Sequence, residues 1–130
     1  MSKRHIEQYI PQVIEVLERT FPDGVIPSAY NGYISSFGAS IIQSGLLPTL
    51  ALFENTNAST KENKEYLSYL IIQILTGSPD DRSLLRYAIE SSEDEAQLKR
   101  KILDISIALK LSIRIFKLDK GKSDKGGKDE

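Results

Sequence analysis

Three basic residues near the C-terminal end of the sequence have the type and spacing needed to contact a phosphate backbone. They are Lys110, Arg114 and Lys117, and the basic pair Lys99 and Arg100 precedes them. On one continuous helix the three side chains project from one side, about 5–6 Å apart along the axis. Phosphates along an RNA strand have a comparable spacing, so each cation is placed to meet one phosphate. The same stripe is also typical of a solvated helix end, where the helix dipole favours cations.

The sequence contains no group of residues that favours catalysis or metal binding. It has no cysteine, which excludes thiol catalysis, disulfide scaffolds and cysteine-based zinc sites. His5 is the only histidine, and we expect it at the surface because no second histidine can join it in a metal pair. Four carboxylates stand around an expected helix start, where their charges complement the helix dipole: Glu90, Glu93, Asp94 and Glu95. We therefore expect no enzyme, and no catalytic residue, metal or cofactor.

The charge of the chain is divided between two neighbouring segments. Its net charge is only −1, which gives no global electrostatic argument for nucleic acid. Residues 80–95 are predominantly acidic, whereas residues 97–117 are basic, with Asp104 as their only acidic member. The basic segment is therefore a local feature of a nearly neutral protein.

An uncharged block extends from Gly24 to Phe53, in a chain of which 27% is charged. Ser, Gln, Gly and Pro interrupt its apolar runs, which are too short to span a membrane. The N-terminal sequence MSKRHIEQYIPQ has no apolar run that could act as a secretory signal. We therefore expect a soluble, cytoplasmic protein without a membrane segment.

The periodicity within the uncharged block predicts a helix with two different sides. Tyr30, Ile34, Phe37 and Ile41 recur at helical steps and are expected to be core residues. Small residues flank this stripe and allow another helix to approach closely, so we expect them to pack against a second subunit. These flanking residues are Gly32, Ser36, Ala39 and Ser40. The pattern favours a helix that is covered on most of its circumference.

Similar patterns predict the remaining helices. The periodicity of apolar residues and the cap signals place them at Lys3 to Thr20, Leu47 to Phe53 after a break at Gly45, from a cap at Ser59 through Tyr66 to Leu75, Ser78 to Ile89, and Ser92 to about Leu118. Capping boxes are expected at Ser59–Glu62 and Ser92–Glu95. Pro11 lies within the first of these helices, where it either forms a kink or stands in the first turn.

One segment fits two secondary structures. Apolar residues alternate strictly from Ile105 to Ile115, as in a half-buried strand, but they also form a helical stripe. We expect helix, because a capping box precedes the segment and no turn signal interrupts it. The sequence as a whole therefore predicts an all-α, single-domain bundle of about five to seven helices over residues 1–118. The charged, low-complexity residues 119–130 are expected to form a disordered tail.

The uncharged block also resembles a known family. Tyr30-x-x-Tyr33, followed by SSFGASIIQSGLLPTLALFEN, is similar to the signature of the small helical subunit of Cmr-type (type III) CRISPR effector complexes. The similarity extends in the same order to EYLSYLIIQIL, Glu65 to Leu75, and to the closing helix from Ala96 to Leu118. It covers more than half of the chain.

The resemblance implies a non-catalytic, all-helical protein that stacks against copies of itself and against larger subunits. These copies would form the minor filament that lines the groove where target RNA pairs with guide RNA. Relatives often carry an aromatic residue beside paired basic residues in the closing helix, whereas this chain has Leu111 and Ser112 there. The resemblance therefore implies an electrostatic contact to RNA phosphates rather than base stacking. The alternative is a helical adaptor that binds protein and does not contact nucleic acid.

Overall fold

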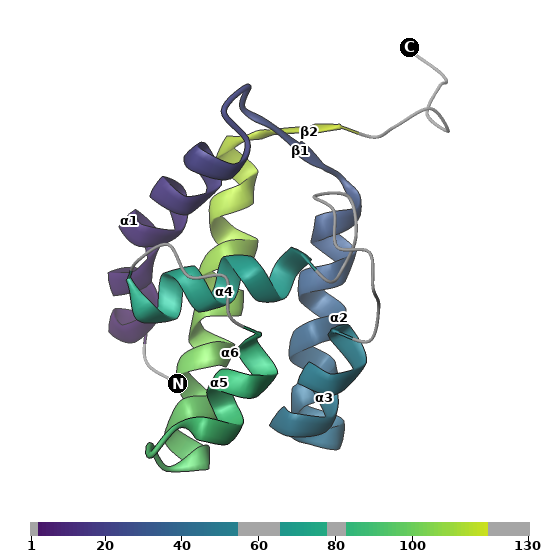
Figure 1. Ribbon diagram of the computed structural model, residues 1–130. Helices are drawn as coiled ribbons and strands as arrows, with labels where there is room; N and C mark the ends of the chain where they lie inside the picture. Colours follow the sequence, from purple (N-terminus) through teal and green to yellow (C-terminus); the bar gives the residue numbers. More distant parts are fainter. Residues whose placement is uncertain (1–2, 55–65, 78–82, 120–130) are drawn as a thin grey trace.

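The computed structural model describes residues 3–54, 66–77 and 83–119 (Figure 1). Their elements are, in chain order, α1 (Lys3–Thr20), β1 (Val25–Pro27), α2 (Ala29–Ser44), α3 (Leu46–Phe53), α4 (Tyr66–Thr76), α5 (Leu84–Glu90), α6 (Glu95–Ser112), the 3-10 turn η1 (Ile113–Ile115) and β2 (Lys117–Asp119). The all-α class and the predicted number of helices are confirmed. None of the described helices has the length and hydropathy needed to cross a bilayer.

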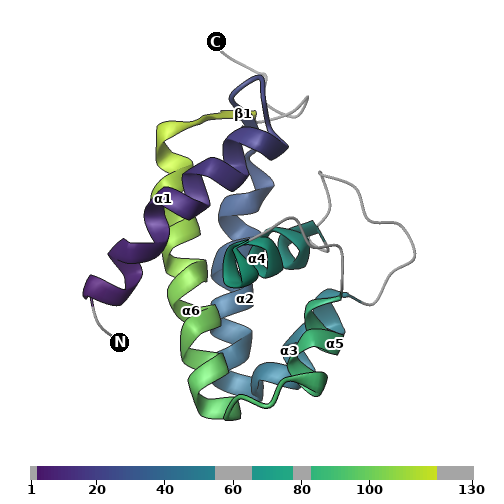
Figure 2. The ribbon, with the colours of Figure 1, turned by 60° about the vertical axis from the view of Figure 1, so that its left-hand side comes forward.

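Helix α6 lies at the centre of the bundle. It packs against α1, α2 and α4, and Figure 2 shows α1 crossing it obliquely. Leu98, Ile102, Ile105 and Leu109 recur every three or four residues and are at most 1% exposed. This spacing gives α6 one continuous apolar side. The helix predicted for the alternating segment is thereby confirmed, because residues 105–112 belong to α6.

Helices α2 and α3 form an uncharged hairpin around aromatic contacts. The ring of Phe37 meets that of Phe53 edge to face, with 5.1 Å between the ring centres. Gly45 joins the helices with a φ of +101°, and its N–H donates to the carbonyl of Ile41 at 2.9 Å. This φ is available to glycine at little steric cost. The predicted break at Gly45 is therefore confirmed.

Other helices of the chain cover α2 on one side only. Tyr30, Ile34, Phe37 and Ile41 are buried as predicted, at 3% exposure or less. The opposite side of the helix remains exposed, so the expectation that α2 is covered on most of its circumference is wrong within this chain. The reason is that the neighbouring helices α3, α4 and α6 all meet α2 along the apolar stripe or its edges.

The end of the closing helix also differs from the prediction. Helix α6 ends at Ser112 rather than near Leu118, and η1 follows it. Lys117–Asp119 then pairs in parallel with Val25–Pro27, so that Val25 is opposite Lys117 (Figure 1). Lys117–Asp119 supplies hydrogen-bond partners for the backbone of β1. This pairing requires an extended backbone, so the helix ends before Lys117. A two-stranded ladder therefore closes one end of the helical bundle.

One predicted helix start is displaced, and one predicted helix is interrupted. Helix α6 begins at Glu95 with Asp94 as its N-cap, so the predicted Ser92–Glu95 capping box is not formed. The backbone of Ser83 is extended, so α5 begins at Leu84, and the Ser83 hydroxyl accepts from the Arg86 N–H at 3.1 Å. The carboxylate of Glu54, at the end of α3, also accepts from the Leu85 N–H at 3.0 Å. This contact joins α3 to the positive end of the α5 dipole.

Several predictions fall on residues that the structure does not describe. They concern the Ser59–Glu62 capping box, the helix start at Ser78 and all of the predicted tail except Asp119, which belongs to β2.

We predict that Phe37→Ala lowers the free energy of unfolding by about 3–5 kcal/mol, the cost of removing a fully buried ring. Phe37 is 0% exposed and contacts Phe53. Urea unfolding monitored by far-ultraviolet circular dichroism measures this difference. Ile42→Ala is the matched control, because Ile42 is 70% exposed on the same helix and its truncation should cost less than about 0.5 kcal/mol. Equal losses for the two variants would contradict the assignment of Phe37 to the core.

Candidate nucleic-acid interface

Four of the five predicted basic residues lie along α6 and the 3-10 turn η1 that continues it. Positions 99 and 110 are separated by about three full helical turns, and positions 100 and 114 by about four, so all four side chains project from neighbouring lines. Arg100 and Arg114 are exposed, whereas Lys99 and Lys110 are half-buried. We call Lys99, Arg100, Lys110 and Arg114 the basic face. It extends for roughly 20 Å along the helix, at a rise of about 1.5 Å per residue.

Lys117 is separated from this face by the end of the helix. Arg114 lies in η1, and Lys117 is the first residue of β2, where its backbone is paired with Val25. The predicted stripe of Lys110, Arg114 and Lys117 on one continuous helix is therefore wrong in its geometry. Among the predicted cations whose side chains the structure describes, the fold brings together Lys99, Arg100, Lys110 and Arg114.

Lys110 connects the basic face to α2. Its ammonium donates to the backbone carbonyl of Asn31 at 3.3 Å and to the Ser35 hydroxyl. An ammonium has three donors, so one of them remains for an external acceptor. Lys110 thus holds α2 beside the basic face and contributes less to an external contact than an unengaged cation would.

The predicted packing residues lie next to this contact. Gly32 and Ser36 follow Asn31 and Ser35 by one position, and Ala39 continues the same line one turn later. All three are exposed, and we call them the α2 flank. A methyl group added at Gly32 would meet nothing within 4 Å. Ser40 differs, because it is half-buried and its hydroxyl forms a hydrogen bond of 2.8 Å with the hydroxyl of Thr49.

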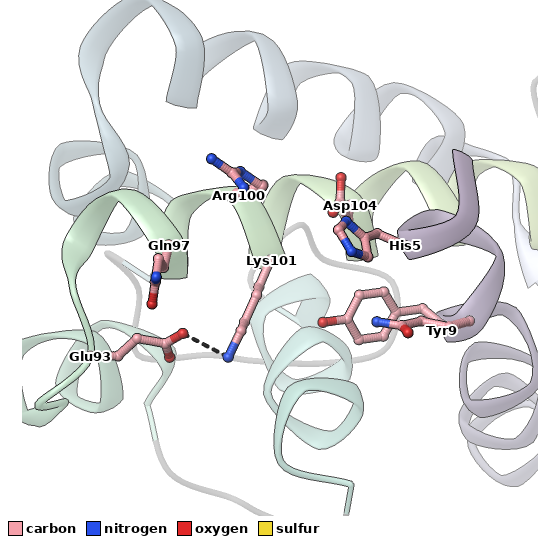
Figure 3. Close-up of a pocket in the computed structure, with 8 residues that line it drawn as sticks. His5, Tyr9, Glu93, Gln97, Arg100, Lys101 and Asp104 are labelled. Atoms are coloured by element: carbon pink, nitrogen blue, oxygen red, sulfur yellow. Dashed lines mark ion pairs between the residues drawn. The ribbon is translucent and has the colours of Figure 1, made fainter. Parts of the chain in front are cut away.

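A cleft between α1 and α6 was not predicted from the sequence. Its volume is about 310 Å³, and Figure 3 shows side chains from both helices around it. His5 and Tyr9 come from α1, whereas Arg100, Lys101 and Asp104 come from α6. Arg100 therefore belongs both to the basic face and to the rim of the cleft.

An ion pair lies at one side of the cleft. The Lys101 ammonium lies 2.6 Å from the carboxylate of Glu93, in the loop before α6 (Figure 3). The hydrogen bond that Lys101 donates to Glu93 raises the pKa of Lys101. Lys101 is consequently engaged within the chain, unlike Arg100 and Arg114, which form no ion pair with any described residue.

Asp104 is buried beside the cleft without full hydrogen bonding. The residue is 2% exposed, and its Oδ1 atom has no hydrogen-bond partner. Burial raises the pKa of this carboxyl group, while the positive charges of His5 and Arg100 lower it by less. Burial also raises the pKa of Tyr9, and Asp104 and Glu93 act in the same direction. The signal in the sequence was the position of Asp104 as the single acidic residue of the basic segment.

The described residues contain no group of three or more histidine or carboxylate side chains that could hold a metal ion. The carboxylates predicted to complement a helix dipole are only partly in that role. Asp94 occupies the N-cap position of α6 without a side-chain capping hydrogen bond, and Glu95 stands in the first turn, while Glu93 pairs with Lys101. What the arrangement can do is bind anions on the basic face and hydrogen-bond donors in the cleft.

Comparison with known proteins gives one match. A family model described as CRISPR-associated protein (Cas_Cmr5) matches residues 3–111. No curated protein and no solved structure shows significant similarity to the chain.

We predict that Asp104→Asn stabilises the protein at pH 7, by about 1 kcal/mol, because it removes a buried charge without removing a hydrogen bond to Oδ1. The sign follows from the raised pKa of Asp104. The carboxylate destabilises the fold above this pKa and is neutral in both states well below the ordinary value of 3.8. The gain should therefore disappear as the pH falls.

Urea unfolding of both proteins between pH 3 and pH 7 measures this dependence. Glu15→Gln is the control, because Glu15 is an exposed carboxylate in the middle of α1 and its neutralisation should leave the stability within about 0.5 kcal/mol. A lower stability of Asp104→Asn at pH 7 would show that the carboxylate has a stabilising partner.

Proposed function

Because the chain belongs to the Cas_Cmr5 family of CRISPR-associated proteins, whose model matches residues 3–111 of 130, we propose that it is a structural subunit of an RNA-guided antiviral effector complex. In this role it performs no catalysis. It packs against copies of itself and against larger subunits in a minor filament that lines the groove of the guide and target RNA. Its place of action is the cytoplasm.

The observation that carries this proposal is the position of two surfaces of different chemistry beside each other. The α2 flank is uncharged and small, and the basic face of α6 adjoins it through the contacts of Lys110 with Asn31 and Ser35. Close packing of helices favours the first kind of surface, and phosphate binding favours the second. A subunit of a filament along RNA needs both.

The basic face supports contact with the RNA backbone rather than with bases. Arg100 and Arg114 are exposed, and a guanidinium can hold a phosphate with two parallel hydrogen bonds. Lys99 adds a third cation on the same side. Phosphate contacts position a strand without reading its sequence, which suits a complex in which base pairing with the guide supplies recognition.

A protein adaptor without RNA contact is the second candidate function. It is favoured by the exposed Ile42 on α2, which is 70% accessible and lies one turn beyond the α2 flank. Both functions use the flank for protein contact. They differ in whether the basic face changes RNA affinity.

We predict that Ser36→Glu prevents close packing of the α2 flank against another subunit. An unpaired charge in a buried interface costs on the order of 3–5 kcal/mol, so the variant should be largely absent from the assembled complex. Co-purification with the other subunits, followed by native mass spectrometry, measures its incorporation. Gln12→Glu is the control, because Gln12 is exposed on α1 and the variant introduces the same charge outside the flank. Normal incorporation of Ser36→Glu would exclude the flank from the interface.

We predict that the double variant Lys99→Gln, Arg114→Gln weakens RNA binding by the assembled complex. The slope of log Kobs against log salt should become shallower by about 1.4, since each phosphate contact to a single strand contributes about 0.7. Arg100 is left unchanged because it also lines the cleft. Fluorescence anisotropy with target RNA at several salt concentrations measures the slope.

The control for this experiment is Arg86→Gln, which removes an exposed cation from α5 and should leave the slope unchanged. If the double variant enters the complex and retains both the affinity and the slope, the basic face is a solvated surface. The adaptor function would then be the better description.

A further inference from the structure

The cleft between α1 and α6 contains a hydrogen-bond acceptor that no residue of the described chain uses. Oδ1 of Asp104 has no partner, although the residue lines the cleft and is 2% exposed. A buried polar atom without a partner costs free energy, and a bound donor would remove this cost. A ligand with N–H groups therefore fits the carboxylate.

The charges around Asp104 favour a neutral donor attached to an anion. Arg100 places a positive charge near the carboxylate and forms no ion pair with a described residue, whereas the charge of Lys101 is balanced by its ion pair with Glu93 on the same cleft. Arg100 would repel a cationic side chain from another protein. A nucleotide meets no such repulsion, because its base is uncharged and its phosphate is attracted by Arg100.

The remaining walls suit a planar base. The ring of Tyr9 is half-buried in the cleft (Figure 3), and bases of single-stranded RNA commonly stack on aromatic rings and arginine planes. The volume of about 310 Å³ lies at the lower end of the range for ligand pockets. It accommodates one base rather than a larger ligand. Gln97, on the α6 wall of the cleft, offers an amide that both donates and accepts.

Among the four bases of RNA, guanine matches a carboxylate best. Its Watson–Crick edge presents N1–H and the N2 amino group side by side, whereas adenine and cytosine present one amino group next to an acceptor. We propose that the cleft binds an unpaired guanine base, with Asp104 accepting from the N1–H and N2–H groups, Tyr9 against the base and Arg100 at the phosphate. The exposed ring of His5, which lies beside Asp104 in Figure 3, is displaced when the base enters. This inference rests on the proposed contact with RNA and adds a base-specific site to it.

The test compares guanosine 5′-monophosphate with inosine 5′-monophosphate, which lacks only the N2 amino group. Both are titrated into the full chain, and the amide resonances of α1 and α6 and of the Gln97 side chain are followed by NMR. We expect saturable changes with the guanine nucleotide and about tenfold weaker binding of the inosine nucleotide, the usual effect of one hydrogen bond to a charged group.

Two variants separate recognition of the base from attraction of the phosphate. Asp104→Asn should lose the difference between the two nucleotides, and the urea unfolding described above shows whether this variant is folded. Arg100→Gln should weaken both nucleotides by the same factor and preserve their ratio. Equal affinities in the native chain, absence of saturable binding, or an unchanged ratio in Asp104→Asn would each overturn the proposal.

A third titration addresses a protein ligand. N-acetylarginine amide carries a planar guanidinium with a similar pair of donors, so tighter binding of this compound than of the guanine nucleotide would overturn the proposal in favour of an arginine from a partner protein. The results of these titrations do not depend on how RNA binding by the assembled complex changes with salt. If the nucleotide titration fails but the salt slope of the Lys99→Gln, Arg114→Gln variant is reduced, only the guanine site is excluded. If that slope is unchanged, the contact of the basic face with the RNA backbone is excluded instead.

Discussion

Burial of one side of α6 is the interaction on which the other features of this protein depend. Leu98, Ile102, Ile105 and Leu109 are at most 1% exposed, and α1, α2 and α4 all pack on this helix. Once the apolar side is fixed, the rotation of α6 about its axis is fixed as well. Lys99, Arg100 and Lys110 are then directed away from the core, so the position of the basic face follows from the packing of the core.

The relation between α2 and α6 is stabilised by a polar contact at the edge of this core. Lys110 reaches across to Asn31 and Ser35, while Gly38 faces Ser106, whose hydroxyl Oγ would lie 3.9 Å from a side-chain carbon added at Gly38. Small residues at the contact allow the helices to lie close together. As a result, an uncharged surface and a basic surface adjoin without an acidic residue between them. In an assembly this would place protein contacts and RNA contacts on neighbouring sides of one subunit.

The burial of Asp104 lowers the stability of the protein. A carboxylate at 2% exposure with an unpaired oxygen destabilises a fold, and an uncharged residue at this position would pack at a lower cost. Such a group is typical of sites whose chemistry serves binding. The cleft is formed where the first half of α1 passes the first half of α6.

The sequence by itself determined which segments are helices and which side of each helix is buried. Tyr30, Phe37 and Leu109 lie in the core where their spacing predicted, because amphipathic periodicity is a property of residues within a few turns of each other. It also determined that Gly45 interrupts α2.

The tertiary structure alone decided features that join distant residues. The helix after Ile105 ends at Ser112 because Lys117 pairs with Val25, more than ninety positions away. Lys110 is occupied by α2, and Asp104 meets His5 and Tyr9 of α1, because the packing of α6 against both helices brings them together. No local pattern specifies these partners, since each depends on how separate helices pack once their apolar sides are buried.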